Sequence, residues 1–234
     1  MRRDDNACET SGSAVSYGRA AGHYASSIRA RRDLLQTLYY ATKNSGLEAA
    51  GYHRQAELAR SQQGEDPNGS EELIRTLEDA QHAAEATAQD AAWSFMLIVD
   101  YAIRRLEQEM REINTRAPSL LTLGAETRTG VRLNAAIRAF ANQARHFHEW
   151  IALGAAEIAS RNESKRNVAT IIALDYDPLD ANASREFLSY FPVMSYFDLE
   201  GQLLQTARDA ITAEGDELGI VLPGSYSIIT RSRD

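Results

Sequence analysis

Cysteine, proline and long apolar runs are all scarce in this chain, and each scarcity excludes a class of protein. Its single cysteine, Cys8, can form neither an internal disulfide framework nor a cysteine zinc site. The most apolar run, WSFMLIVDYAI, contains Asp100 and is too short to span a bilayer. The N-terminus lacks the apolar segment of a secretory signal. These absences predict a cytoplasmic protein without a membrane anchor.

Acidic and basic residues are unevenly distributed along the sequence. The formal net charge of −8 argues against a broad, non-specific coating of nucleic acid. Residues 131–170, however, carry six Lys or Arg against three Glu, whereas residues 171–234 carry four Arg against eleven acids. A local anion-binding site is therefore expected only in the first of these regions.

The composition and the spacing of apolar residues predict an all-α protein. Apolar positions recur every three or four residues from Tyr17 to Thr42, and residues 43–51, with two glycines, are expected to kink or break that helix. Residues 61–70 read as a loop, and Ser70 as the cap of a second helix. The second helix should run to Ile113, about 45 residues, and form a long antiparallel hairpin with the first.

Further helices are predicted after this hairpin. One is expected from Val131 to Ser160, a short one before Pro178 and a last one from Phe197 or Asp198 to Glu214. The β-branched segment KRNVATIIALDYDP also fits a strand, but no partner strand is evident. We therefore expect a four- to five-helix bundle over residues 15–160. Residues 1–14 should be a disordered N-terminus, and residues 161–234 a mostly helical C-terminal extension packed on the bundle.

The stretch RAFANQARHFHEW, residues 138–150, carries most of the chemistry. On a helical wheel the apolar residues form one stripe, and the polar side chains lie opposite within an arc of about 100°. The stripe comprises Leu133, Ile137, Phe140, Ala144, Phe147 and Ile151, and the polar face comprises Arg138, Asn142, Arg145, His146 and Glu149. Such a face is also what any amphipathic helix presents to solvent. Trp150 is expected to anchor neighbouring helices, and His148 to pack at the edge of the stripe.

The residue types on the polar face suit cleavage of RNA through its 2′-hydroxyl group. His146 can exchange protons near neutral pH, and Arg138 or Arg145 can hold the phosphate with its planar fork. Asn142 lies one helical turn before His146 and can orient it. Glu149 would hold or tune a nearby arginine. Two such helices facing each other in a homodimer would turn an exposed face into an enclosed site.

The segment ANQARH on a long helix of an all-α bundle resembles the HEPN superfamily of helical dimers. Many HEPN proteins are metal-independent endoribonucleases of toxin–antitoxin and anti-phage defence systems. Their motif is an arginine, four to six intervening residues and a histidine, often with a polar residue just after the arginine. Asn142 and His146 match, but Ala141 stands where the arginine belongs. The resemblance implies RNA as substrate, no cofactor or metal, a homodimer and a partner such as a cognate antitoxin.

Two other functions fit the sequence. A bundle of helices can hold a metal ion with His and carboxylate ligands. In this respect the chain resembles the DinB-like bundle hydrolases, which bind their metal through three histidines. The candidates are His53, His82, and His146 or His148 with Glu149. The other function is that of a non-catalytic helical interaction protein, antitoxin-like or structural, which the loss of arginine at Ala141 favours.

Overall fold

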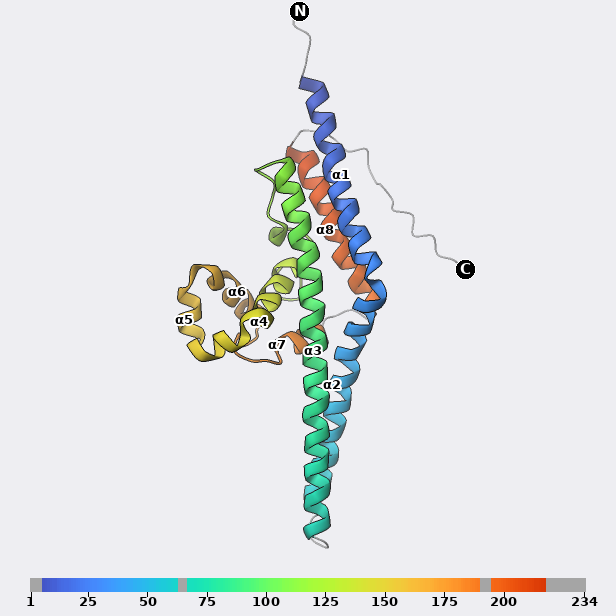
Figure 1. Ribbon diagram of the computed structural model, residues 1–234, viewed down its shortest axis with the longest axis vertical. Helices are drawn as coiled ribbons and strands as arrows, with labels where there is room; N and C mark the ends of the chain where they lie inside the picture. The colour runs from blue at the N-terminus through green and yellow to red at the C-terminus, as the bar shows by residue number, and fades with distance from the viewer. Residues whose placement is uncertain (1–5, 63–66, 190–194, 218–234) are drawn as a thin grey trace, which may run out of the picture.

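The computed structural model describes residues 6–62, 67–189 and 195–217, and the chain within them is all-α, as predicted. Figure 1 shows a long rod of helices with a smaller group of helices at its side. The helices are α1 (Asn6–Ala30), α2 (Arg32–Ser61), α3 (Pro67–Ile113), the 3₁₀ helix η1 (Leu120–Thr122), α4 (Leu133–Leu153), α5 (Ala155–Ser160), α6 (Asn162–Ala173), α7 (Ala183–Ser189) and α8 (Tyr196–Glu217). In those ranges the only β pairing is one isolated bridge, between Glu126 and Arg132.

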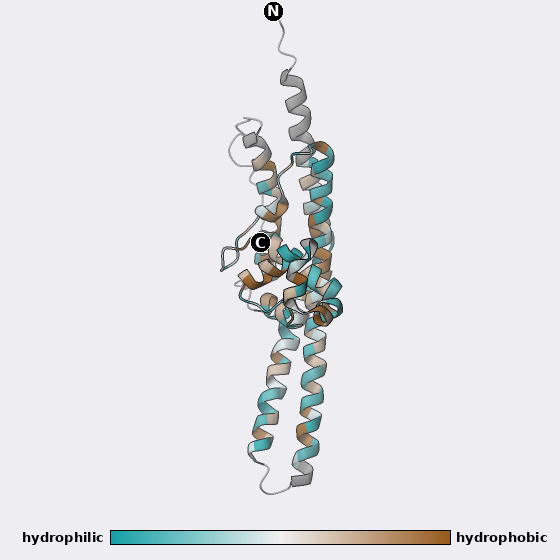
Figure 2. Cartoon of the chain, turned by 90° about the vertical axis from the view of Figure 1, so that its left-hand side faces the viewer, coloured by the Kyte–Doolittle hydropathy of each residue, from teal (hydrophilic) through white to brown (hydrophobic). Residues whose placement is uncertain are grey.

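The antiparallel pair α2–α3 forms the long axis of the molecule (Figure 1). α3 runs unbroken for 47 residues, because it contains neither glycine nor proline after Gly69 and its apolar positions repeat every three or four residues. Residues 47–61 and 67–88, here called the arm, project beyond the other helices. The arm buries mainly small side chains, which are Ala49, Ala56, Ile74, Ala84 and Ala88. Its helices are largely hydrophilic in Figure 2.

The body consists of α1, α8 and the second half of α3, and it holds much of the core. α1 and α8 lie side by side (Figure 1), and the Tyr24 hydroxyl donates a hydrogen bond to the carbonyl oxygen of Leu203 at 3.1 Å. Burial raises the pKa of the Tyr24 hydroxyl well above its ordinary value. Fully buried side chains such as Ile28 and Phe95 each stabilise the fold by roughly 1.5–3 kcal/mol.

The lobe, which comprises α4 to α7, packs against the side of α3 (Figure 1). α4 packs on both α3 and α6, so it is covered on more than one side, while α7 packs directly on α2 and α3. The rings of Phe140 and Phe187 join α4 to α7, with centroids 5.0 Å apart. At the end of α4, Gly154 has φ +77°, a conformation that glycine adopts without strain, and the chain turns there into α5.

Several predicted boundaries are wrong for identifiable reasons. α1 already begins at Asn6, so residues 6–14 are helical, and residues 1–5 lie outside the described residues. The break between the first helices falls at Arg31, while α2 passes through Gly46 and Gly51 because α3 supports it along its length. α3 begins at Pro67 and not at Ser70, since proline is well tolerated in the first turn.

Other boundaries in the second half of the chain follow the prediction more closely. Residues 162–173 are helical, so the helical interpretation of KRNVATIIALDYDP is confirmed. The helix expected over residues 131–160 is divided by Gly154, but the last helix is confirmed as α8. Residues 190–194 and the tail from 218 onward lie outside the described residues. α8 packs on α1, so the first and the last helix share one core.

Candidate functional site

α4 carries all five side chains that the sequence assigns to one polar face. Its predicted apolar stripe is confirmed at Leu133, Ile137 and Phe140, which are buried, but Ile151 is 52% exposed. The reason is that a strict alternation of threes and fours drifts around a 3.6-residue helix, and the end of α4 also borders α5 and α6 at Trp150 and Leu153. Trp150 is buried there, as expected of an anchor, whereas His148 is exposed.

Arg138 is not on a solvent-facing surface, contrary to the prediction. Its side chain is only 13% exposed and lies between α4 and α3. Its Nε donates to Oδ1 of Asp100 at 3.0 Å, and its Nη1 donates to Oε2 of Glu107 at 2.8 Å. Both carboxylates come from α3, which the helical wheel of a single helix cannot represent. Arg138 therefore joins two helices and is not available to hold a phosphate beside His146.

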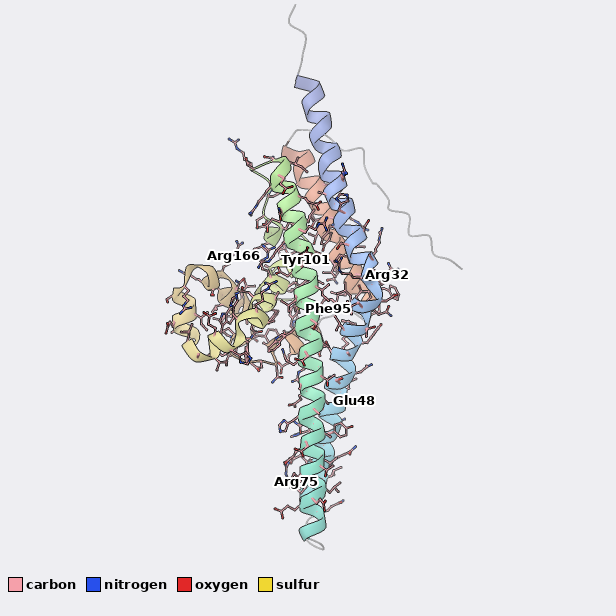
Figure 3. All side chains as sticks on the ribbon, viewed as in Figure 1. Arg32, Glu48, Arg75, Phe95, Tyr101 and Arg166 are labelled. Carbon is pink, nitrogen blue, oxygen red and sulfur yellow. The ribbon has the colours of Figure 1, made fainter. Side chains whose placement is uncertain are left out.

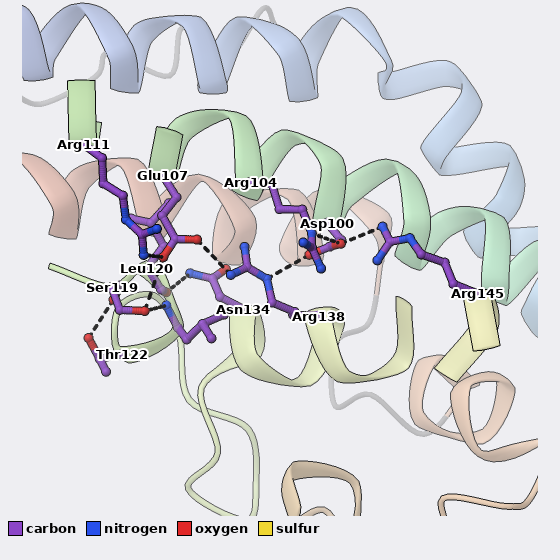
Figure 4. A network of polar contacts seen from close by, with 11 residues as sticks. Asp100, Arg104, Glu107, Arg111, Ser119, Leu120, Thr122, Asn134, Arg138 and Arg145 are labelled. Carbon is purple, nitrogen blue, oxygen red and sulfur yellow. Dashed lines mark hydrogen bonds and ion pairs between the residues drawn. The ribbon is translucent and has the colours of Figure 1, made fainter. Parts of the chain in front are cut away.

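Asp100 is the centre of the polar contacts between α3 and α4. Its side chain is fully buried and accepts hydrogen bonds from three arginines, Arg104 at 2.8 Å, Arg138 at 3.0 Å and Arg145 at 2.8 Å. A buried carboxylate is costly unless it is paired and hydrogen-bonded, and three guanidinium groups meet that need. We call this group the Asp100 cluster; it comprises Asp100, Arg104, Glu107, Arg111, Arg138 and Arg145, most of it drawn in Figure 4.

The sequence contained a signal for this cluster. Asp100 is the only charged residue within the most apolar run of the chain, WSFMLIVDYAI. A carboxylate in such a run must find cationic partners when the helix is buried. Arg104, one turn later on the same helix, was the local candidate. The two arginines from α4 require knowledge of how α3 and α4 pair, which no local pattern supplies.

A pocket of about 250 Å³ lies where α4, α5 and α6 meet, and we call it the His146 pocket. Its walls are formed by Asn142, His146, Glu149, Trp150, Leu153, Ile158, Arg161 and Ser164. Three of the five predicted side chains, Asn142, His146 and Glu149, therefore share one pocket. The other two, Arg138 and Arg145, do not line it and turn towards α3 instead.

His146 and Glu149 form a pair inside this pocket. Nδ1 of His146 lies 3.2 Å from Oε2 of Glu149. An ionised carboxylate only accepts hydrogen bonds, so this contact favours the tautomer that carries its proton on Nδ1 and leaves Nε2 with a lone pair. Glu149, and not Asn142, is thus the side chain that contacts His146. Within the described residues, the amide of Asn142 makes no side-chain hydrogen bond.

The pocket's arginine is Arg161, which the sequence analysis missed. Its Nη1 donates to Oε1 of Glu149 at 3.0 Å, and its Nη2 lies 3.5 Å from Oε1 of Glu157. Glu149 therefore bridges His146 and Arg161. Arg161 lies 15 positions after His146, and only the reversal of the chain at Gly154 brings the two together. The positive surplus of residues 131–170 was the only sequence signal for it.

Position 141, where the HEPN motif has its arginine, faces the interior. Ala141 is fully buried in the main core cluster. Asn142 and His146 lie on another side of α4, at the pocket. A long charged side chain at position 141 would thus enter the core and not the pocket. The arginine of the motif has no direct counterpart at that position.

The histidines of the metal hypothesis lie in separate regions. His53 and His82 are on the arm, whereas His146 and His148 are on the lobe. Throughout the described ranges, no group of three or more His, Cys, Asp or Glu side chains is placed to hold a metal ion. That alternative set of ligands is therefore not assembled by this fold.

Comparisons with known proteins add no assignment to this geometry. No protein-family model, no curated protein and no solved structure matches the chain. None of the helices in the described part of the chain combines the length and the apolar composition needed to cross a membrane. The functional interpretation consequently rests on the His146 pocket itself.

Proposed function

We propose that this chain binds RNA at the His146 pocket and cleaves it without a metal ion. The observation that supports the proposal is the arrangement of an exposed histidine, its carboxylate partner and an arginine around one pocket. These are the groups that attack by a 2′-hydroxyl requires: a base, a group that orients the base, and a cation for the phosphate.

In the proposed reaction, Nε2 of His146 accepts the proton of the 2′-hydroxyl group. The 2′-oxygen then forms a bond to the adjacent phosphorus, and the bond from phosphorus to the 5′-oxygen breaks. The leaving 5′-oxygen takes a proton from water, and the product is a 2′,3′-cyclic phosphate. Glu149 stabilises the imidazolium ion that forms, because it already accepts the Nδ1 proton.

Arg161 replaces the two arginines that the sequence favoured for holding the phosphate. Its side chain is 47% exposed, and its partners Glu149 and Glu157 are exposed too. Exposed ion pairs contribute little stability, so a phosphate can displace Glu157 from Arg161 at small cost. Arg138 and Arg145 instead turn towards α3 and do not line the pocket.

The HEPN resemblance supports the same function and places it in a biological setting. A protein of this type would act in a prokaryotic toxin–antitoxin or anti-phage defence system. It would work as a homodimer, with a cognate antitoxin as protein partner. The match of Asn142 and His146 carries that part of the proposal, and Arg161 in place of an arginine at position 141 would make the chain a divergent member.

The first experiment is cleavage of single-stranded RNA by purified protein in EDTA. His146→Ala should lower the cleavage rate by roughly 100- to 10,000-fold, the usual contribution of a general base. His148→Ala is the matched control, because His148 is an exposed histidine on the same helix that does not line the pocket. Equal cleavage by wild type and His146→Ala protein would exclude His146 as the base.

A non-catalytic interaction protein is the second candidate. The observation that favours it is that Arg138 and Arg145 both turn towards Asp100, so neither arginine predicted to hold the phosphate lies in the His146 pocket. The acidic arm, with seven Asp or Glu against three Arg in residues 47–61 and 67–88, suits a basic helical partner. In this case the wild-type protein leaves RNA intact in the EDTA assay.

A further inference from the structure

A strip of exposed side chains runs along α3 and includes the exposed arginines of the Asp100 cluster. Tyr101, Arg104 and Arg111 are 58%, 50% and 60% exposed. Their spacings of three and seven residues place them on one side of the helix. Arg145, from α4, reaches the same region by binding Asp100. We call Tyr101, Arg104, Arg111 and Arg145 the α3 strip.

The cations of this region outnumber the anions they bind. Four arginines of the Asp100 cluster share two carboxylates, Asp100 and Glu107. Glu112, at the edge of the hollow that Arg104 and Arg111 line, accepts a hydrogen bond from Gln108 at 2.9 Å. Including Glu112, the region keeps one positive charge in surplus on a protein whose net charge is −8. That surplus favours an anionic ligand.

Among the residues that the structure describes, each exposed arginine of the strip has hydrogen-bond donors without an acceptor. Arg104 uses its Nε to bind Asp100, Arg111 its Nη2 to bind Glu107, and Arg145 its Nη2 to bind Asp100. A guanidinium group carries five N–H donors, so most of those in the strip remain available. The buried carboxylates also hold the guanidinium groups in place, which reduces the side-chain entropy that is lost when a ligand binds.

Tyr101 adds a second kind of contact to this cationic surface. Its ring is exposed one turn before Arg104 on α3, and Figure 3 places it on the half of that helix beside α4. Exposed aromatic rings next to cations are the elements with which proteins hold single-stranded nucleic acid, since the ring stacks on a base and the cations contact phosphates. A duplex keeps its bases stacked inside and cannot use such a ring.

We infer that the α3 strip binds single-stranded RNA and leads it to the His146 pocket, an inference that rests on the proposed function. Arg145 directly precedes His146 in the chain, so the strip and the pocket meet at one position of α4. Phosphates contact Arg104, Arg111 and Arg145, and one base stacks on Tyr101. The substrate class is therefore unpaired RNA of several nucleotides, not duplex RNA.

Binding is measured in the His146→Ala background, so that the RNA stays intact. Fluorescence anisotropy compares a labelled 12-nucleotide single strand with the same strand in a duplex. Tyr101→Ala should weaken single-strand binding roughly five- to one-hundredfold, the contribution of one stacked base. Combined Arg104→Ala and Arg111→Ala should lower the slope of log affinity against log salt by about 1.4, for two phosphate contacts.

Two further variants test the charge argument. Arg75→Ala removes an arginine from the arm end of α3, far from Tyr101 in Figure 3, and should leave binding unchanged. Glu112→Gln removes the nearby carboxylate and should strengthen binding. Asp100 keeps Arg138 and Arg145 when Arg104 is replaced, so the fold should persist, and urea unfolding of each variant checks this.

The outcomes separate this inference from the proposed function. Cleavage by wild-type protein, with unchanged binding in Tyr101→Ala and the double arginine variant, would overturn the RNA-binding role of the α3 strip and leave the proposed nuclease activity standing. Single-strand binding that depends on the strip, without cleavage, would support the role of the strip and overturn the proposed nuclease activity. Equal affinity for the duplex and the single strand would also overturn the strip, and absence of any RNA binding would overturn both.

Discussion

Arg145 and His146 are neighbours in the chain, yet they belong to two regions with opposite properties. Arg145 turns to α3, where the buried Asp100 holds it together with Arg104 and Arg138. His146 turns to an open pocket, where its partner Glu149 and the arginine bound to Glu149, Arg161, are half exposed. Asp100 is fully buried between two helices, whereas the His146 pocket is open to solvent. One residue along α4 is enough to direct two neighbouring side chains to different regions.

The largest effect is expected from restoring the arginine of the HEPN motif. Ala141→Arg places a charge in the core and should destabilise the protein by about 4 kcal/mol or more, without creating activity. Ala152→Arg, at an exposed position of the same helix, should change the free energy of unfolding by less than about 0.5 kcal/mol. Urea unfolding compares them. A stable, more active Ala141→Arg protein would show that position 141 faces the site.

Removal of the central carboxylate should have the next largest effect. Asp100→Ala leaves three arginines without their buried partner and should cost about 3–5 kcal/mol in the free energy of unfolding. Glu149→Ala, which removes the carboxylate of the other region, should cost at most about 1 kcal/mol because its ion pairs are exposed. Similar losses in both variants would remove the distinction between the two regions.

Replacing one arginine in each region should give the same contrast in stability as replacing the carboxylates, but a smaller one. Arg138→Ala should cost about 2 kcal/mol, since Asp100 keeps two other arginines and Glu107 keeps Arg111. Arg161→Ala should cost less than about 1 kcal/mol but weaken RNA binding. Unfolding and RNA affinity are measured for both proteins. Equal loss of RNA affinity in both would mean that Arg138 reaches the ligand.

The smallest effect on stability is expected at the proposed base. His146→Ala should change the free energy of unfolding by less than about 0.5 kcal/mol, because the side chain is 46% exposed and its contact with Glu149 lies in solvent. Thermal unfolding in parallel with the cleavage assay tests this. Loss of activity accompanied by unfolding would assign His146 to the core and not to a site.

Features that lie within a single helix could be predicted from the sequence, whereas contacts between helices could not. The long run of α3 follows from its spacing, and Asn142, His146 and Glu149 share a face because each lies three or four residues from the next. The contact of Arg138 with Asp100 spans 38 positions and depends on how α4 crosses α3. Arg161 enters the pocket only because the chain reverses at Gly154, a turn that no periodic pattern announces.

The packing of α1 against α8 sets the order in which this protein folds during its synthesis. The α2–α3 hairpin is complete as soon as Ile113 has left the ribosome, and its contacts are local. Tyr24 must wait for Leu203, 179 positions later, before its hydroxyl finds its acceptor. Until then part of the apolar side of the first helix to emerge is uncovered, and nascent chains in that condition are prone to aggregate. α1 is therefore the helix that a chaperone would need to bind for the longest time during synthesis.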